Sequence, residues 1–122
     1  MREVTVTEVA DVLDAAVREK GEDFVYSPPG EWGICQYLHG TKPGCLIGHV
    51  LIRLGAIPGE LALQEGVPAN ALEYDRLGLD IPQNAVEALQ AAQDEQDEGE
   101  TWGEARKAFN GALGRLNAPL TV

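Results

Sequence analysis

The chain has 122 residues, 44% of them hydrophobic, which is enough apolar material for one core and predicts a single domain over residues 1–122. It carries nine Lys and Arg against 20 Asp and Glu, so the formal net charge is -11. Because so acidic a surface repels phosphate backbones and anionic lipid, the charge excludes direct binding to nucleic acid or to a membrane and leaves solubility or a protein partner as its purpose.

Residues 1–20 indicate an amphipathic helix rather than a signal peptide, because charges occur throughout and an apolar h-region is missing. Thr5 and Glu8 have the spacing of a capping box, and Gly21 is the expected stop. No apolar run reaches the roughly 18 residues that a membrane span needs. We therefore expect a cytoplasmic protein.

A small hairpin is predicted next, at about residues 24–37. Two short runs rich in aromatic and β-branched residues, Phe24 to Tyr26 and Gly33 to Tyr37, flank a Ser-Pro-Pro-Gly turn.

Residues 44–55 predict the central helix of the core, because the stretch CLIGHVLIRLG is almost uniformly apolar. Gly55 and Pro58 mark its end. Gly48 inside this helix costs about 1 kcal/mol relative to Ala, so we expect another backbone to approach closely there.

Further helices are expected at 58–65, at 68–76 and from Pro82 to about Glu98, each opened by a proline, with Asp80 as a plausible cap for the third. The last helix begins at a second capping box, Thr101 with Glu104. Its apolar stripe consists of Trp102, Ala105, Phe109, Leu113 and Leu116. The predicted fold class is therefore mainly α, a single compact domain of five to six helices around the central helix.

Both cysteines and both histidines lie close together, as Cys35, His39, Cys45 and His49. Two thiolates and two imidazoles form a tetrahedral zinc set, and zinc is the one cofactor that the sequence suggests. Simple burial of the cysteines explains the same residues without metal. A disulfide is a third interpretation. A catalytic thiol is a fourth, with Cys45 activated at a helix N-terminus and His39 or His49 as its base. The sequence leaves all four open.

The region around this cluster also lacks acids. Residues 32–59 contain no Asp or Glu, but they include Lys42 and Arg53. Backbone N–H groups at the start of the central helix, beside Lys42, make Lys42, Gly44 and Cys45 a candidate anion site. Exclusion of carboxylates from a core helix gives the same pattern without a ligand.

An acidic run follows in the C-terminal half, where the eight residues QDEQDEGE (93–100) contain five acids. Most such runs are solvated surfaces, and a few dock on basic partners. Carboxylates near a helix C-terminus oppose the macrodipole, so helix stability does not account for them. The candidate partner-binding residues are Asp94, Glu95, Asp97 and Glu98.

The stretches CQYLHGTKPGCLIGHVLIRLG and AAQDEQDEGETWGEA resemble a group of small uncharacterised proteins of actinobacteria and, especially, of their bacteriophages. The resemblance covers much of residues 24–108. It implies a cytoplasmic accessory protein made during phage infection, and it transfers no catalytic residue.

The sequence lacks the GxSxG, Walker, GxGxxG and HExxH motifs. We therefore expect a non-enzymatic protein that binds a host or other partner protein through its acidic surface. The alternatives are a small-ligand or thiol-dependent enzyme site around Cys45 and His49, or a zinc-stabilised module. The sequence leaves the oligomeric state open.

Overall fold

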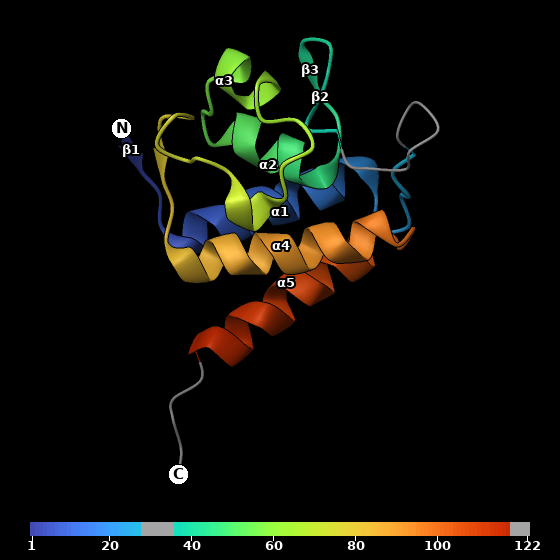
Figure 1. Ribbon diagram of the computed structural model, residues 1–122. Helices are drawn as coiled ribbons and strands as arrows, with labels where there is room; N and C mark the ends of the chain where they lie inside the picture. Colours follow the sequence, from blue (N-terminus) through green and yellow to red (C-terminus); the bar gives the residue numbers. More distant parts are fainter. Residues whose placement is uncertain (28–35, 118–122) are drawn as a thin grey trace.

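A computed structural model describes residues 1–27 and 36–117 (Figure 1). Within these residues the helices are α1 (Val6–Lys20), α2 (Leu46–Arg53), α3 (Pro58–Ala62), α4 (Gln83–Asp97) and α5 (Trp102–Asn117), and a 3-10 turn, η1, covers Ala69–Ala71. The strands are β1 (Arg2–Glu3), β2 (Leu38–His39), β3 (Lys42–Pro43) and β4 (Leu79–Asp80). The predicted fold class, mainly α in one compact domain, is confirmed.

Helix α1 begins and ends where its local signals predict. The Thr5 hydroxyl oxygen accepts from the Glu8 N–H at 3.1 Å, and the Thr5 N–H donates to the Glu8 carboxylate at 3.1 Å, which completes the capping box. Gly21 stops the helix at φ +101°, a conformation that side chains other than glycine rarely adopt. The buried face consists of Val9, Leu13, Ala16 and Val17.

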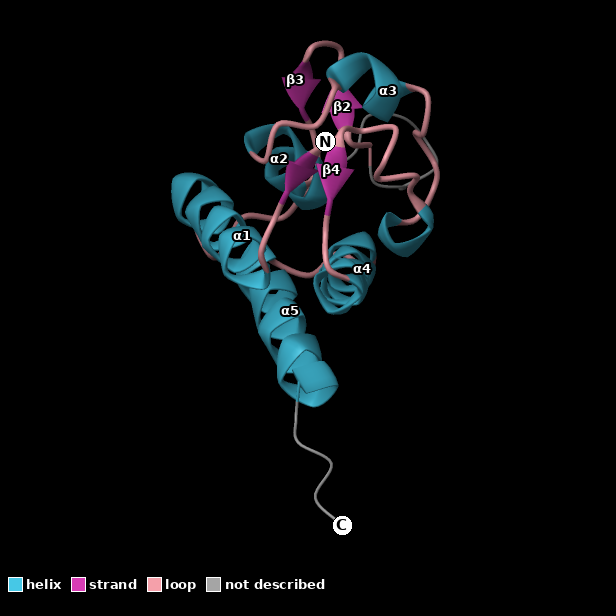
Figure 2. Ribbon diagram, turned by 90° about the vertical axis from the view of Figure 1, so that its left-hand side faces the viewer, coloured by secondary structure: helices cyan, strands magenta, loops and turns pink. Residues whose placement is uncertain are grey.

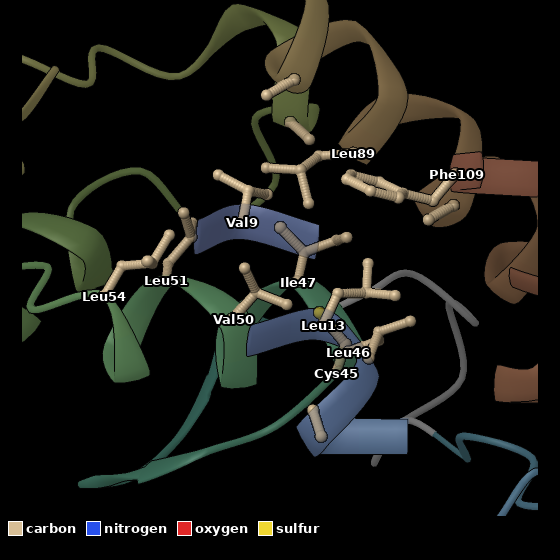
Figure 3. Packing of buried hydrophobic residues seen from close by; sticks show 14 of the residues in the cluster. Val9, Leu13, Cys45, Leu46, Ile47, Val50, Leu51, Leu54, Leu89 and Phe109 are labelled. Atoms are coloured by element: carbon tan, nitrogen blue, oxygen red, sulfur yellow. The ribbon is translucent and has the colours of Figure 1, made fainter. Parts of the chain in front are cut away.

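Helix α2 packs between α1 and α4 and supplies much of the core (Figure 3). Its Ile47, Val50 and Leu51 are fully buried, as the uniform apolar pattern predicts. The close approach expected at Gly48 is confirmed, since a Cβ there would lie 2.8 Å from the Tyr37 carbonyl carbon. Real Cβ atoms essentially never come so close to other heavy atoms.

The antiparallel hairpin lies later in the chain than predicted. Strands β2 and β3 pair with each other around Gly40, whose φ of +67° suits the first central position of a two-residue turn. Val25 instead forms a bridge with Thr101, at the start of α5. The middle of the predicted hairpin, residues 28–35, lies outside the described residues.

The helix predicted for residues 68–76 is wrong, because only η1 forms there. Side chains hold the rest of this segment in an irregular path. Gln64 accepts from the Glu73 N–H at 2.7 Å and donates to the Glu73 carbonyl at 3.3 Å, while the Tyr74 hydroxyl donates to the Ala69 carbonyl at 2.7 Å. These contacts satisfy backbone groups that a helix would otherwise pair.

A parallel pairing of β1 with β4 closes the fold at the N-terminus (Figure 2). Asp80, the predicted cap of the following helix, lies in β4 and accepts from the Val4 N–H through its carbonyl. Helix α4 begins after Pro82 without a side-chain cap, and it packs along α5.

Candidate functional site

The acidic end of α4 consists of Asp94, Glu95, Asp97, Glu98 and Glu100. Glu95 is partly exposed and the other four side chains are exposed. None of the five forms an ion pair with another described residue. The acidic end is therefore a concentration of negative charge that no described cation neutralises through an ion pair.

Most cations of the chain are paired elsewhere. Arg106 bridges Asp14, at 2.8 Å, and Glu22, and so ties α5 to the end of α1. Both carboxylates raise the pKa of the Arg106 guanidinium, first Glu22 through its hydrogen bond. The other cations found in ion pairs are Arg2, Arg18, Arg53, Arg76 and Lys107. These six cations therefore neutralise the other faces of the molecule and not the acidic end.

Two glutamines inside the acidic run point into the protein and fix the position of α4. The Gln96 side-chain oxygen accepts from the Leu46 N–H at 2.8 Å and from the Trp102 indole N–H at 3.0 Å. It thereby satisfies a first-turn amide of α2, which the helix itself leaves unpaired.

Gln93 does the same for the η1 segment. Its oxygen accepts from the Ala69 N–H at 2.8 Å, and its amide donates to the Tyr37 hydroxyl at 2.9 Å. Burial raises the pKa of Tyr37 to about 12, so this hydroxyl stays protonated at neutral pH. Gln93 and Gln96 are 4% and 3% exposed, and their buried contacts make the helix below the acidic end rigid.

The sequence pattern places Ala92 or Gln93 on the inner face of this helix, but it assigns no role to Gln96, because residues 93–100 indicate one acidic run. A signal was available in the spacing of Gln90, Gln93 and Gln96, since helical residues three apart lie on neighbouring positions of one face. Gln90 completes the series by accepting from the Asn70 N–H at 2.9 Å.

A shallow hollow of about 220 Å³ lies beside the acidic end, between α4 and the loop of residues 66–68. Asp94 and Asp97 line it on the helix side. Although the Asp97 side chain is exposed, its neighbours partly desolvate the carboxyl and so raise its pKa. A hydrogen bond from Gln96 offsets part of this shift, and the negative charge of Asp94 raises the pKa further. A positive charge placed in this hollow would relieve the repulsion.

The four Cys and His candidates are not assembled as a metal site within the described part of the chain. The His39 Nε2 lies 2.6 Å from the Tyr26 hydroxyl, and the His49 ring packs edge-on against Trp102, with 5.4 Å between ring centroids. Burial lowers the pKa of His49, and the charges of Lys20 and His39 lower it further. The described residues contain no group of three or more His, Cys, Asp or Glu side chains that could hold a metal.

Cys45 is buried and its sulfur is in a disulfide. A bridged sulfur is not a thiolate, so in this state Cys45 serves neither as a nucleophile nor as a zinc ligand. The disulfide state of Cys45 therefore gives no support to the predicted zinc set, of which Cys35 lies outside the described residues.

The N–H groups of the candidate anion site already have acceptors in the protein. Gly44 donates to the Tyr37 carbonyl at 2.8 Å and Cys45 donates to the Gln36 carbonyl at 2.8 Å, while the Leu46 N–H is held by Gln96. Lys42 is exposed on β3. An anion at Lys42, Gly44 and Cys45 therefore stays a prediction that this geometry does not support.

A wide-open hollow of about 660 Å³ lies between α1 and α2. Four of its charged side chains pair with one another, since Arg18 pairs with Asp14 at 3.0 Å and Arg53 pairs with Glu19. No described histidine or cysteine lines it, so the surroundings of Cys45 and His49 do not extend into this hollow.

Comparison with protein-family models, with curated proteins and with solved structures finds no match to this chain. No described helix is both long enough and apolar enough to cross a membrane. The acidic end of α4, with its rigid support, is thus the candidate site that the geometry favours.

Proposed function

We propose that this chain is a non-enzymatic accessory protein that binds another protein through the acidic end of α4. One observation carries the proposal: the five carboxylates of the acidic end have no ion-pair partner among the described residues, whereas six cations are paired elsewhere. A complementary surface rich in Lys and Arg would supply the missing counter-charges.

Helix energetics support the proposal. The acidic end lies where the α4 macrodipole is negative, and each such carboxylate opposes the dipole by about 0.3–1 kcal/mol. The first turn of α4, where acids would stabilise the helix, contains none. Charges that reduce stability in the free protein are typical of a binding surface, where a partner compensates for them.

The rigidity of the acidic end also suits binding. Gln93 and Gln96 alternate with the acidic residues and are buried, so the carboxylates project from a helix that is fixed to α2 and to η1. Charges presented by a fixed helix lose less conformational entropy on binding than charges on a loop. The sequence resemblance makes a protein of an actinobacterial phage host the natural class of partner.

The test is quantitative capture from an actinobacterial lysate with three immobilised forms of the full chain. They are the wild type, the variant Asp94→Lys/Glu95→Lys/Asp97→Lys/Glu98→Lys, and a control in which Asp11, Glu60, Asp75 and Asp80 become Lys. The control has the same net charge change and affects acids that form no ion pairs in the described residues.

We expect a protein that the wild type and the control retain equally and that the α4 variant loses by about tenfold or more. Purified partner should then bind the wild type more weakly as salt increases. Equal loss of the captured protein from both variants would mean that net charge, and not the acidic end of α4, governs retention. The proposal would be contradicted if no captured protein depended on the acidic end.

A further inference from the structure

The C-terminal half of α5 is packed on one side only. Figure 1 and Figure 2 both show this half extending past α4, away from the rest of the molecule. Phe109 and Ala112 are buried against the core, but Leu113 is only partly buried and Leu116 is 51% exposed. The predicted apolar stripe of α5 thus continues beyond the surface that the described residues cover.

A groove of about 430 Å³ runs between this half of α5 and α4. Its apolar wall is made by Ala91, Ala112 and Leu116. Its charged walls have opposite signs, with Glu87 and Asp94 on α4 and Arg115 on α5. Arg115 forms no ion pair with another described residue.

A groove with an acidic wall, a basic wall and an apolar floor complements itself after a two-fold rotation. Arg115 of one copy then meets Glu87 and Asp94 of the other, and the two Leu116 side chains cover the apolar walls. After Glu104 the chain has Arg106, Lys107 and Arg115 and no acid at all, so this segment reduces the repulsion that a second copy of a chain of net charge -11 would otherwise meet.

Gly114 is consistent with a close approach from outside. It lies on the exposed side of α5, and a Cβ built there has no described heavy atom within 4 Å, so none of the described residues requires a glycine at this position. Glycine within a helix lowers helix stability relative to alanine.

We propose that the groove between α4 and the C-terminal half of α5 is the contact surface of a homodimer, with Leu116 at its centre and Arg115 paired with Glu87 of the second copy. The groove shares Asp94 with the acidic end of α4, but the proposed ion pair of Arg115 with Glu87 does not depend on partner binding there. It commits to a second copy because the walls of the groove provide both charges of each ion pair.

The test is sedimentation velocity of the full chain from micromolar to hundred-micromolar concentration. The wild type should show a concentration-dependent dimer. Leu116→Asp and Arg115→Glu should each weaken dimerisation about tenfold or more, and Glu87→Arg combined with Arg115→Glu should restore it. Leu63→Asp is the matched control, because Leu63 is 79% exposed at the end of α3 and should have no effect.

A second variant separates dimerisation from folding. Gly114→Leu should weaken the dimer by crowding the contact while the melting temperature of the monomer stays the same or rises, since leucine favours helix more than glycine does. A wild type that is monomeric at every concentration overturns the proposal. The proposal is also overturned if the full chain stays monomeric and a chain without residues 118–122 dimerises, because the groove would then be the docking site of the chain's own end.

Discussion

At the scale of single residues, Gly48 shows how one missing side chain permits the fold. The Tyr37 backbone lies directly over Gly48, and Tyr37 is itself anchored by Glu65, whose carboxylate accepts from the Tyr37 N–H at 2.7 Å and from the Leu38 N–H at 3.2 Å. Neither side of this contact can move away without loss of other bonds.

We predict that Gly48→Ala lowers the free energy of unfolding by about 1–3 kcal/mol, because the added methyl group overpacks the contact with Tyr37 and this cost exceeds the gain in helix propensity. Chemical denaturation monitored by circular dichroism measures it. Gly59→Ala is the matched control, since Gly59 is also helical and a Cβ there meets nothing within 4 Å. A Gly48→Ala variant as stable as the control would mean that Tyr37 does not press on α2.

At the scale of elements, Gln96 connects three helices, because it lies on α4 and accepts from α2 and α5. Its oxygen is the single acceptor that serves both the Leu46 amide and the Trp102 indole. Removal of that oxygen would leave two buried donors without a partner.

The predicted cost of Gln96→Leu is about 2–4 kcal/mol, since each unsatisfied buried donor costs about 1–3 kcal/mol. Thermal unfolding together with the near-ultraviolet signal of Trp102 reports both the loss of stability and the altered indole environment. Gln90→Leu is the control on the same helix, because its bonds are exposed to water, and it should cost less than about 1 kcal/mol. Equal losses from the two variants would contradict the role assigned to Gln96.

At the scale of the whole molecule, the charge distribution leaves electrostatic repulsion at the acidic end of α4, and this repulsion lowers the stability of the fold. Partial burial and the neighbouring Asp94 raise the pKa of Asp97, so its ionised form is less favourable in the folded protein than in the unfolded chain. For a carboxyl whose pKa rises on folding, ionisation destabilises the fold, and the penalty disappears as the pH falls to the unfolded value of 3.8.

Asp97→Asn should therefore raise the free energy of unfolding at pH 7 by about 0.3–1 kcal/mol, the usual effect of relieving a carboxylate at a helix C-terminus. This gain should shrink as the pH falls and vanish below pH 3.8, where wild-type Asp97 is also neutral. Urea titrations of both proteins across this pH range measure it, with Asp75→Asn as the control outside the helices. A constant difference at all pH values would assign the effect to something other than ionisation.

Much of the fold could be predicted because its signals are local. The Thr5 and Glu8 capping box, the stop at Gly21 and the apolar period of α2 each depend on residues within a few positions of one another. The second capping box is present in one direction, since the Glu104 N–H donates to the Thr101 hydroxyl at 3.1 Å. The candidate site could be predicted in part, because the acids and the inward position of Gln93 follow from the sequence, whereas the buried contacts of Gln96 do not.

Periodicity, capping or composition over a short span is enough to predict helices α1, α2, α4 and α5, the close packing at Gly48 and the concentration of negative charge at the end of α4. Only the tertiary structure decided that Val25 bridges Thr101, that residues 68–76 stay irregular and that Gln96 pairs with an amide 50 positions away. Those features depend on partners that folding brings together from distant positions, and no local spacing encodes such partners.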